Sequence, residues 1–210
     1  MTQAARWIHL GPVQSADLPA ACAGYARAGA GRIPPTALWG RAAESIRLAD
    51  GVWVEPGEFA FALLCPPHLA PGRRERWVSW GLSPVVSAFR RFGAHAWLEG
   101  AEVRLHGRRV ACAQAREIDG QVAVLGALVP DMPAIDPEAP AAGELLRGQP
   151  WLEALNREGR ARRMLAAFRH ALEIQHDWQF DTAWPTREEL EAIALAEGEA
   201  LHALGALAAR

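Results

Sequence analysis

The first 130 residues contain short hydrophobic runs of the kind that form strands. The clearest run is 59–65, FAFALLC, whose near-continuous apolar character predicts a strand buried on both faces, as in the middle of a sheet. Residues 7–10 predict a shorter strand that ends at Gly11 and Pro12, and residues 37–48 hold shorter, irregular strand signals. The N-terminal part of the chain is therefore expected to form a sheet.

Residues 102–130 predict three consecutive strands joined by two tight turns. The turns fall at His106-Gly107 and at Asp119-Gly120. The second is the stronger hairpin signal, because Asp-Gly suits a turn that needs positive φ. Two successive hairpins are expected here.

Two stretches between these strands predict helices. Ser15 is of a residue type that caps helix N-termini, and it predicts a helix that runs to about Tyr25 or Arg27. Residues 76–92 predict one helix or two pieces, with Ser83 as the cap and Pro84 at the first position of the second piece.

The C-terminal third predicts helices after a proline-rich stretch. Residues 131–150 show little periodicity and are typical of a surface loop or a linker. Residues 158–174 predict an amphipathic helix. Thr186 and Glu189 have capping-box spacing at the start of a last helix.

The chain length of 210 residues is enough for one good-sized domain. We expect a single domain with a sheet-containing core over residues 1–130, a loop over residues 131–150, and helices over residues 151–210 that pack on the core. This order of elements indicates an α+β protein.

Composition excludes several classes of function. The formal charge of −2 gives no general attraction to nucleic acid or to anionic membranes. No apolar run approaches the roughly 20 residues that cross a bilayer, and the first residues lack the pattern of a signal peptide, so a soluble cytoplasmic protein is expected. The three cysteines form no disulfide framework, and the seven histidines show no metal-binding spacing.

All 22 basic residues are arginine. Codon bias in a GC-rich genome explains such a composition without any mechanism. The consequence for chemistry is firm, because the chain can supply no lysine Schiff base, lysine-bound phosphate or catalytic lysine.

Residues 107–116, GRRVACAQAR, resemble the biotin and lipoate protein ligase superfamily, whose pattern here is approximately Gly-Arg-Lys-(Val/Ile)-(Ala/Ser)-Gly-(Ser/Ile)-(Ala/Gln). Residues 102–105 fit the strand before this motif, which usually begins with an acidic residue, and residues 125–129 fit the recurrent strand after it. Residues 7–12 and 186–201 are similar to the family's opening strand and closing helix.

The resemblance implies a central mixed, largely antiparallel sheet flanked by helices, with an octanoyl, lipoyl or biotinyl substrate in a slot beside these strands. In the ligases, a lysine at the position of Arg109 contacts the substrate and the adenylate phosphate. In the octanoyltransferases, this lysine acts with a cysteine that holds the acyl group as a thioester. Both kinds of enzyme transfer the group to a lysine on a lipoyl or acyl carrier domain, which is the partner that the resemblance implies.

Three positions differ from the family pattern. Arg109 replaces the lysine; arginine keeps the charge but has a larger, planar head. Cys112 occupies a position that usually holds glycine, where a side chain would narrow the slot. Residues 48–57 replace the ligase loop of consecutive glycines, so the backbone cannot approach a phosphate as closely. ATP activation is therefore the family activity with the least support.

Each candidate residue also has a purely structural interpretation. Arg109 is either an anchor for a ligand carboxylate or a solvated strand residue. Strand alternation places Cys112 on the opposite face from Arg109 unless a bulge intervenes. Cys112 is either a nucleophile or, as we favour, a small buried residue.

The family motif also suggests residues that could line the substrate slot: Glu102, Gly107, Ala111 and Gly126. Five of the nine tryptophans fall near this region, and some of them could line an apolar pocket, although tryptophans are more often part of a core. These five are Trp39, Trp53, Trp77, Trp80 and Trp97, of which Trp53 and Trp97 are taken as slot candidates.

Three hypotheses follow for the function. The first is a divergent ligase-like protein that binds an acyl-type ligand or its carrier domain, with the usual catalysis lost or altered. The second is an active acyltransferase that uses Arg109 in place of lysine. The third is a non-catalytic scaffold or interaction protein whose slot is filled by side chains. An open apolar slot beside Arg109 would favour the first two, and a closed one the third.

Overall fold

The computed structural model describes residues 2–14, 17–29, 33–129 and 157–208. Its centre is an eight-stranded mixed sheet, in which β1 pairs in parallel with both its neighbours and all other neighbouring pairs are antiparallel. The order across the sheet is β10 (Trp178–Thr182), β1 (Gln3–Val13), β2 (Thr36–Ala42), β5 (Phe59–Cys65), β9 (Gln121–Leu128), β8 (Arg108–Ile118), β7 (Glu102–Leu105) and β6 (Trp97–Glu99). The expected α+β fold with a largely antiparallel sheet is confirmed.

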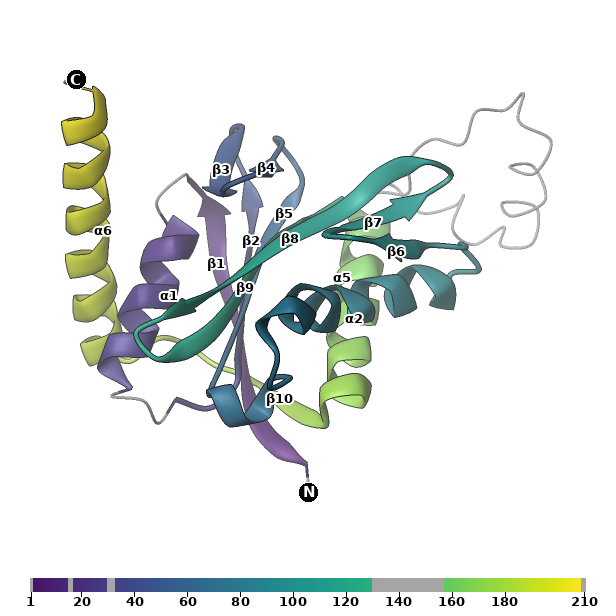
Figure 1. Cartoon of the computed structure of the whole chain (residues 1–210), viewed down its shortest axis with the longest axis horizontal. Coiled ribbons are helices and arrows are strands. Elements are labelled where there is room, and N and C mark those ends of the chain that lie inside the picture. Colours follow the sequence, from purple (N-terminus) through teal and green to yellow (C-terminus); the bar gives the residue numbers. More distant parts are fainter. Residues whose placement is uncertain (1, 15–16, 30–32, 130–156, 209–210) are drawn as a thin grey trace.

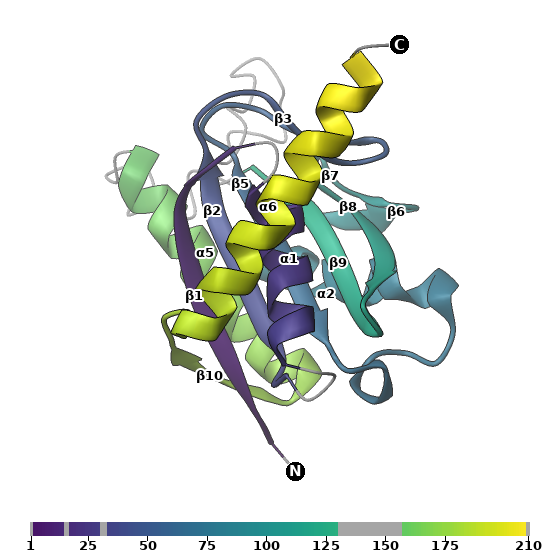
Figure 2. The ribbon, with the colours of Figure 1, turned by 90° about the vertical axis from the view of Figure 1, so that its left-hand side faces the viewer.

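Helices cover both faces of this sheet (Figures 1 and 2). One face carries α1 (Asp17–Ala28) and α6 (Arg187–Ala208), and the other carries α2 (Trp77–Arg91) and α5 (Arg157–His176). A separate two-stranded hairpin, β3 (Ile46–Ala49) and β4 (Val52–Val54), lies on the same face as α1. Among the described helices, none is long and apolar enough to span a bilayer.

The sheet divides the buried apolar residues into two clusters. The first cluster lies between the sheet and the α2–α5 pair, and it includes Phe61, Phe89 and Phe168. The second lies between the sheet, α1 and the β3–β4 hairpin. All seven residues of β5 are buried, as its apolar run predicts, because this strand contributes side chains to both clusters.

The two predicted hairpins are present. His106 and Gly107 have φ of 50° and 76° between β7 and β8, and Asp119 and Gly120 have φ of 45° and 75° between β8 and β9. Two successive residues with positive φ form the tight turn whose twist matches that of antiparallel strands. Local sequence chemistry therefore determines the geometry of this part of the sheet.

Two element boundaries differ from the sequence-based prediction. β1 does not end at Gly11 but continues to Val13 through an irregularity between His9 and Pro12, where Gly11 adopts a φ of 80°. The stretch around Pro84 forms one helix rather than two pieces, and Pro84 is buried inside it. Packing of the apolar face of α2 against the sheet outweighs the hydrogen bond that proline cannot make.

Two other predictions cannot be compared with the structure, and one strand was not predicted. The cap at Ser15 and the proline-rich stretch 131–150 lie outside the described residues. Residues 178–182, which had no strand signal, form β10 and pair with β1 at the edge of the sheet. The C-terminal part thus contributes a strand as well as helices.

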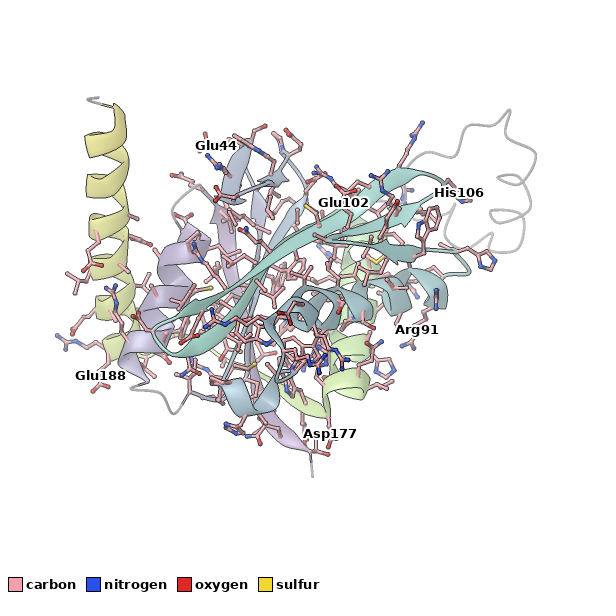
Figure 3. All side chains as sticks on the ribbon, in the orientation of Figure 1. Glu44, Arg91, Glu102, His106, Asp177 and Glu188 are labelled. Carbon is pink, nitrogen blue, oxygen red and sulfur yellow. The ribbon has the colours of Figure 1, made fainter. Side chains whose placement is uncertain are left out.

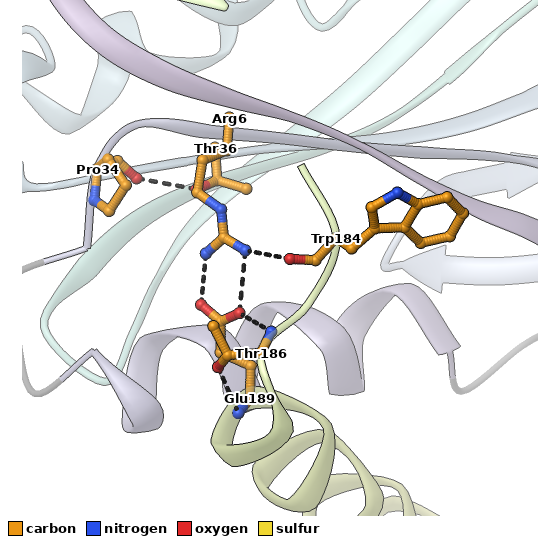
Figure 4. A network of polar contacts seen from close by, with 6 residues as sticks. All are labelled: Arg6, Pro34, Thr36, Trp184, Thr186 and Glu189. Carbon is orange, nitrogen blue, oxygen red and sulfur yellow. Dashed lines mark hydrogen bonds and ion pairs between the residues drawn. The ribbon is translucent and has the colours of Figure 1, made fainter. Parts of the chain in front are cut away.

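The start of α6 is fixed by the predicted capping box and by a contact with β1 (Figure 4). The backbone N–H of Glu189 donates to Thr186 Oγ1 at 3.2 Å, and the N–H of Thr186 donates to the Glu189 carboxylate at 2.7 Å. Arg6 binds both carboxylate oxygens of Glu189 and also donates to the Trp184 carbonyl at 3.1 Å. One carboxylate thus caps α6 and joins it to the sheet.

Candidate functional site

Strand β8 contains one extra residue where it pairs with β7. Arg104 lies opposite Arg109, and Glu102 lies opposite Cys112, so two residues of β8 correspond to one of β7. This bulge at Val110 shifts the alternation of side chains. Arg109 and Cys112 therefore lie on the same face of the sheet, together with Glu102.

The charged groups near this bulge are only partly satisfied by one another. Arg104 binds Glu102 at 2.7 Å and Glu99 at 3.0 Å. Glu102, at the start of β7, and His106, in the turn after β7, mark this region in Figure 3. Arg109 is exposed and forms no ion pair with a described residue.

Cys112 lies behind Arg109 in the second hydrophobic cluster and is 3% exposed. Burial raises the pKa of the Cys112 thiol, although the positive charge of Arg109 acts in the opposite direction. A thiol with a raised pKa is mostly protonated at neutral pH and is a poor nucleophile. The environment of Cys112 therefore favours a structural role.

The sheet face that carries Cys112 is closed by the β3–β4 hairpin. Four apolar side chains of the hairpin pack in the same cluster as Cys112, and each is at most 3% exposed: Ile46, Leu48, Val52 and Val54. If a slot wide enough for an acyl chain lay here, the residues around it would be exposed to water when no ligand is bound. Packed side chains occupy the space between this hairpin and Cys112.

The other predicted slot residues are not gathered at one place. Ala111 packs in the first cluster, on the opposite face from Cys112. A Cβ added to Gly126 would lie 2.4 Å from the end of the Phe61 ring, so that ring fills the space which glycine leaves. Gly107 lies in the open β7–β8 turn.

Trp53 on β4 and Trp97 on β6 are surface residues, 47% and 41% exposed. Of the predicted site residues, Arg109, Glu102 and Cys112 come together, and Trp97 lies on the same sheet face, in register with Arg109 through Arg104.

An open cavity of about 560 Å³ lies between the end of the sheet and α5. Its volume is within the range of small-molecule sites. Apolar and aromatic groups from strands and from α5 form most of its wall, and charged groups lie on one side. The residues that define it best are His9, Trp39, Arg41, Phe59, Glu158 and Leu165.

The aromatic wall of this cavity is built by strand register. His9 of β1 lies opposite Trp39 of β2, and their rings stack with centroids 4.0 Å apart. Partial burial lowers the pKa of His9, so its imidazole is neutral at pH 7. The indole Nε1 of Trp39 is buried and has no hydrogen-bond acceptor among the described residues. This donor is buried behind the cavity wall and is unsatisfied by the described part of the chain.

The charged side of the cavity consists of one carboxylate and two guanidinium groups. Glu158 of α5 binds Arg41 of β2 at 3.0 Å and Arg162 at 3.3 Å. These two contacts, with Arg162 the stronger influence, hold the pKa of Glu158 below its usual range. Arg41 also lies over the Phe59 ring, 5.4 Å from its centroid.

One partial signal for this cavity is present in the sequence. Trp39 is one of the tryptophans that could line an apolar pocket, but no motif distinguishes His9, Arg41 or Glu158. Parallel pairing of β1 with β2 brings His9 beside Trp39, and α5 approaches from the other end of the chain. Such a site arises from topology rather than from local spacing.

In the described ranges, no group of three or more His, Cys, Asp or Glu residues is arranged to hold a metal ion.

No family model matches the sequence, and no curated protein matches it. Solved structures do match the fold. The bi-partite lipoate protein ligase studied with its E2 lipoyl domain from Thermoplasma acidophilum matches with a TM-score of 0.66 and 11% identity, over 93% of this chain and 92% of that one.

Two further matches come from the same group of enzymes. A putative lipoate protein ligase from T. acidophilum with bound lipoic acid has a TM-score of 0.60 and 11% identity, over 93% of this chain and 95% of that one. Lipoate-protein ligase A bound with ATP has a TM-score of 0.57 and 11% identity, over 94% and 95%. The resemblance found in the sequence is therefore confirmed at the level of the fold: this chain has the fold of the lipoate protein ligases.

Proposed function

We propose that this protein binds an acyl-type ligand, of the octanoyl, lipoyl or biotinyl kind, and does not carry out the usual ligation. The observation that supports this most directly is the cavity of about 560 Å³ with an aromatic wall and a charged side. An apolar chain fits against Trp39, Phe59 and Leu165, while the head group faces the arginines. The ligand therefore lies on the α5 side of the sheet rather than beside Arg109.

Three features argue against ligation. The chain has no lysine, and Arg109 stands where the ligases place theirs. The space beside Cys112 is filled by the β3–β4 hairpin. The loop between β3 and β4 contains one glycine, Gly51, instead of a run of glycines that could surround a phosphate. ATP is for this reason not part of the proposal, although one structural neighbour was solved with ATP bound.

The natural partner proposed for such a protein is a carrier domain. The neighbour from T. acidophilum was studied with its E2 lipoyl domain. On this chain, the exposed Arg109 near the β7–β8 turn provides a positive charge for an acidic patch on such a domain.

Two alternatives each have one observation in their favour. The bulge that places Arg109 on the face of Cys112 is what an acyltransferase using both residues would need. The closed face beside Cys112 is what a scaffold would show. The first alternative predicts acyl transfer, and the second predicts no ligand binding.

Titration calorimetry with octanoate and with lipoate tests the proposal. We expect saturable binding to the wild type, and at least about tenfold weaker binding to Leu165→Trp, because the larger side chain fills the cavity. Trp53→Phe, a change on β4 across the sheet, is the control and should bind as the wild type does. Absence of binding to the wild type would leave the scaffold alternative.

A transfer assay tests the loss of ligation. The protein is incubated with octanoyl-carrier protein, or with lipoate and ATP, together with an apo lipoyl domain, and the mass of the acceptor is followed. We expect the acceptor mass to stay unchanged. A gain equal to one octanoyl or lipoyl group would establish the acyltransferase alternative.

A further inference from the structure

Glu158 occupies the position at the cavity that an anionic ligand would need. It comes from the first turn of α5 and reaches across to Arg41 on β2, while its other oxygen binds Arg162. A carboxylate bound by two guanidinium groups is the arrangement by which proteins recognise carboxylate ligands. Here, the carboxylate belongs to the protein itself.

Arg41 is held in place independently of Glu158. Its guanidinium lies over the Phe59 ring at 5.4 Å, and its strand is paired on both sides, with β1 and with β5. The side chain of Arg41 is 41% exposed, so this ring contact favours its orientation only modestly. Arg41 therefore has one contact at the cavity that does not depend on Glu158.

Glu158 is held less firmly. Its side chain is 49% exposed, and both of its contacts are ion pairs in contact with water. Ion pairs of this kind contribute little, and one carboxylate can replace another on arginine at small cost. The charge of Glu158 persists at neutral pH, because its pKa is held below the usual range, mainly by Arg162 and then by Arg41.

We infer that Glu158 is a built-in competitor for the ligand head group: a ligand carboxylate displaces Glu158 from Arg41 while the ligand chain enters the cavity. This inference rests on the proposed function. It makes Arg41 the residue that selects a free carboxylic acid over a neutral amide or ester of the same chain. No bond is made or broken; one ion pair replaces another.

The buried indole N–H of Trp39 supports a ligand with oxygen acceptors. This group has no acceptor among the described residues, although it belongs to a residue of the cavity wall. An unsatisfied buried donor destabilises the protein until an acceptor arrives. The Trp39 ring would have to shift before a ligand oxygen could accept from this N–H, since the atom is buried.

Titrations of octanoate and octanamide against three variants test the inference. Glu158→Gln keeps the size of the side chain and removes its charge, so octanoate should bind about three- to fivefold more tightly and octanamide equally well. Arg41→Gln should weaken octanoate about tenfold and leave octanamide unchanged. Glu191→Gln, which removes a similar exposed ion pair on α6, is the matched control and should change neither affinity.

The outcomes separate this inference from the proposed function. Equal affinity of the wild type for octanoate and octanamide, with both lost in Leu165→Trp, would refute the role of Arg41 and Glu158 and leave the cavity as the ligand site. Unchanged or weaker octanoate binding in Glu158→Gln would also refute the competitor role. Absence of binding of either ligand to the wild type would overturn both proposals.

Discussion

One inserted residue, Val110, decides which neighbours Arg109 has. Without it, strand alternation would place Arg109 and Cys112 on opposite faces of the sheet. With it, the charge of Arg109 reaches the thiol of Cys112 and partly offsets the effect of burial on the pKa of that thiol. A sequence pattern of period two cannot show a bulge, because the bulge depends on pairing with β7.

A second residue whose chemistry depends on burial is His176. Its ring stacks on Trp80, with centroids 4.3 Å apart, and lies edge-on to Trp178. Burial lowers the pKa of His176 to about 4, so the ring is neutral in the folded protein at pH 7.

We predict that His176 makes the folded protein less stable in acid. The unfolded chain binds a proton near pH 6.5, whereas the folded chain binds it only near pH 4. The contribution of neutral His176 to the unfolding free energy is therefore fully present above pH 6.5. It is lost as the pH falls toward about 4, and the unfolding free energy decreases by about 3 kcal/mol in total. His176→Phe keeps an aromatic ring against Trp80 and should lose less stability over this interval, as measured by urea unfolding at several pH values. An identical pH dependence in both proteins would contradict the prediction.

At the scale of elements, α6 shows what local sequence can and cannot predict. The capping box at Thr186 and Glu189 was visible as a spacing of three residues. The partner of Glu189, Arg6, was not, because 183 residues separate the two. The result is a carboxylate with two roles. Burial alone would raise the pKa of Glu189, but the contacts with Arg6 and with Thr186 outweigh it and lower the pKa.

Two substitutions separate these roles. Glu189→Gln keeps the length needed for the capping box but removes the charge opposite Arg6, and should cost about 2–3 kcal/mol of unfolding free energy. Thr186→Ala removes half of the cap and should cost about 1 kcal/mol. Urea unfolding followed by tryptophan fluorescence measures both values. A larger cost for Thr186→Ala would show that the cap, not the ion pair, holds α6.

Most elements could be predicted from the sequence, because their signals are local. The buried run of β5, the Asp119-Gly120 turn and the cap of α6 each depend on a few adjacent residues. The continuity of α2 through Pro84 and the existence of β10 could not be predicted in this way. Both depend on tertiary packing, which outweighs local preference.

At the scale of the whole molecule, the two faces of the sheet differ in what they can accept. The α1 face is filled by the β3–β4 hairpin, and the α5 face carries the cavity. The motif around Arg109 predicts the fold, whereas the cavity lies on the other face of the sheet. A local motif indicates how neighbouring strands pair. Whether a cavity forms depends instead on the packing of side chains that are distant in sequence.

Restoring the family lysine should therefore not restore ligation. In Arg109→Lys the side chains of Leu48, Val52 and Val54 would still be packed in the cluster that contains Cys112. We expect the variant to leave an apo lipoyl domain unmodified with lipoate and ATP, as judged by acceptor mass, and to unfold at the same urea concentration as the wild type. Modification of the acceptor by the variant would show that the hairpin opens.

The pairing of β1 with β10 has a consequence for how the chain folds. β10 begins at Trp178 and is the outer neighbour of β1, the first strand of the chain. Until those late residues have been synthesised, β1 remains an open sheet edge that carries Trp7 and Ile8, and an unprotected apolar edge can pair with other chains. Contacts this distant in sequence also slow folding, because a long loop must close first. We therefore expect this edge of the sheet to be completed late, with the nascent protein most prone to aggregation before β10 has formed.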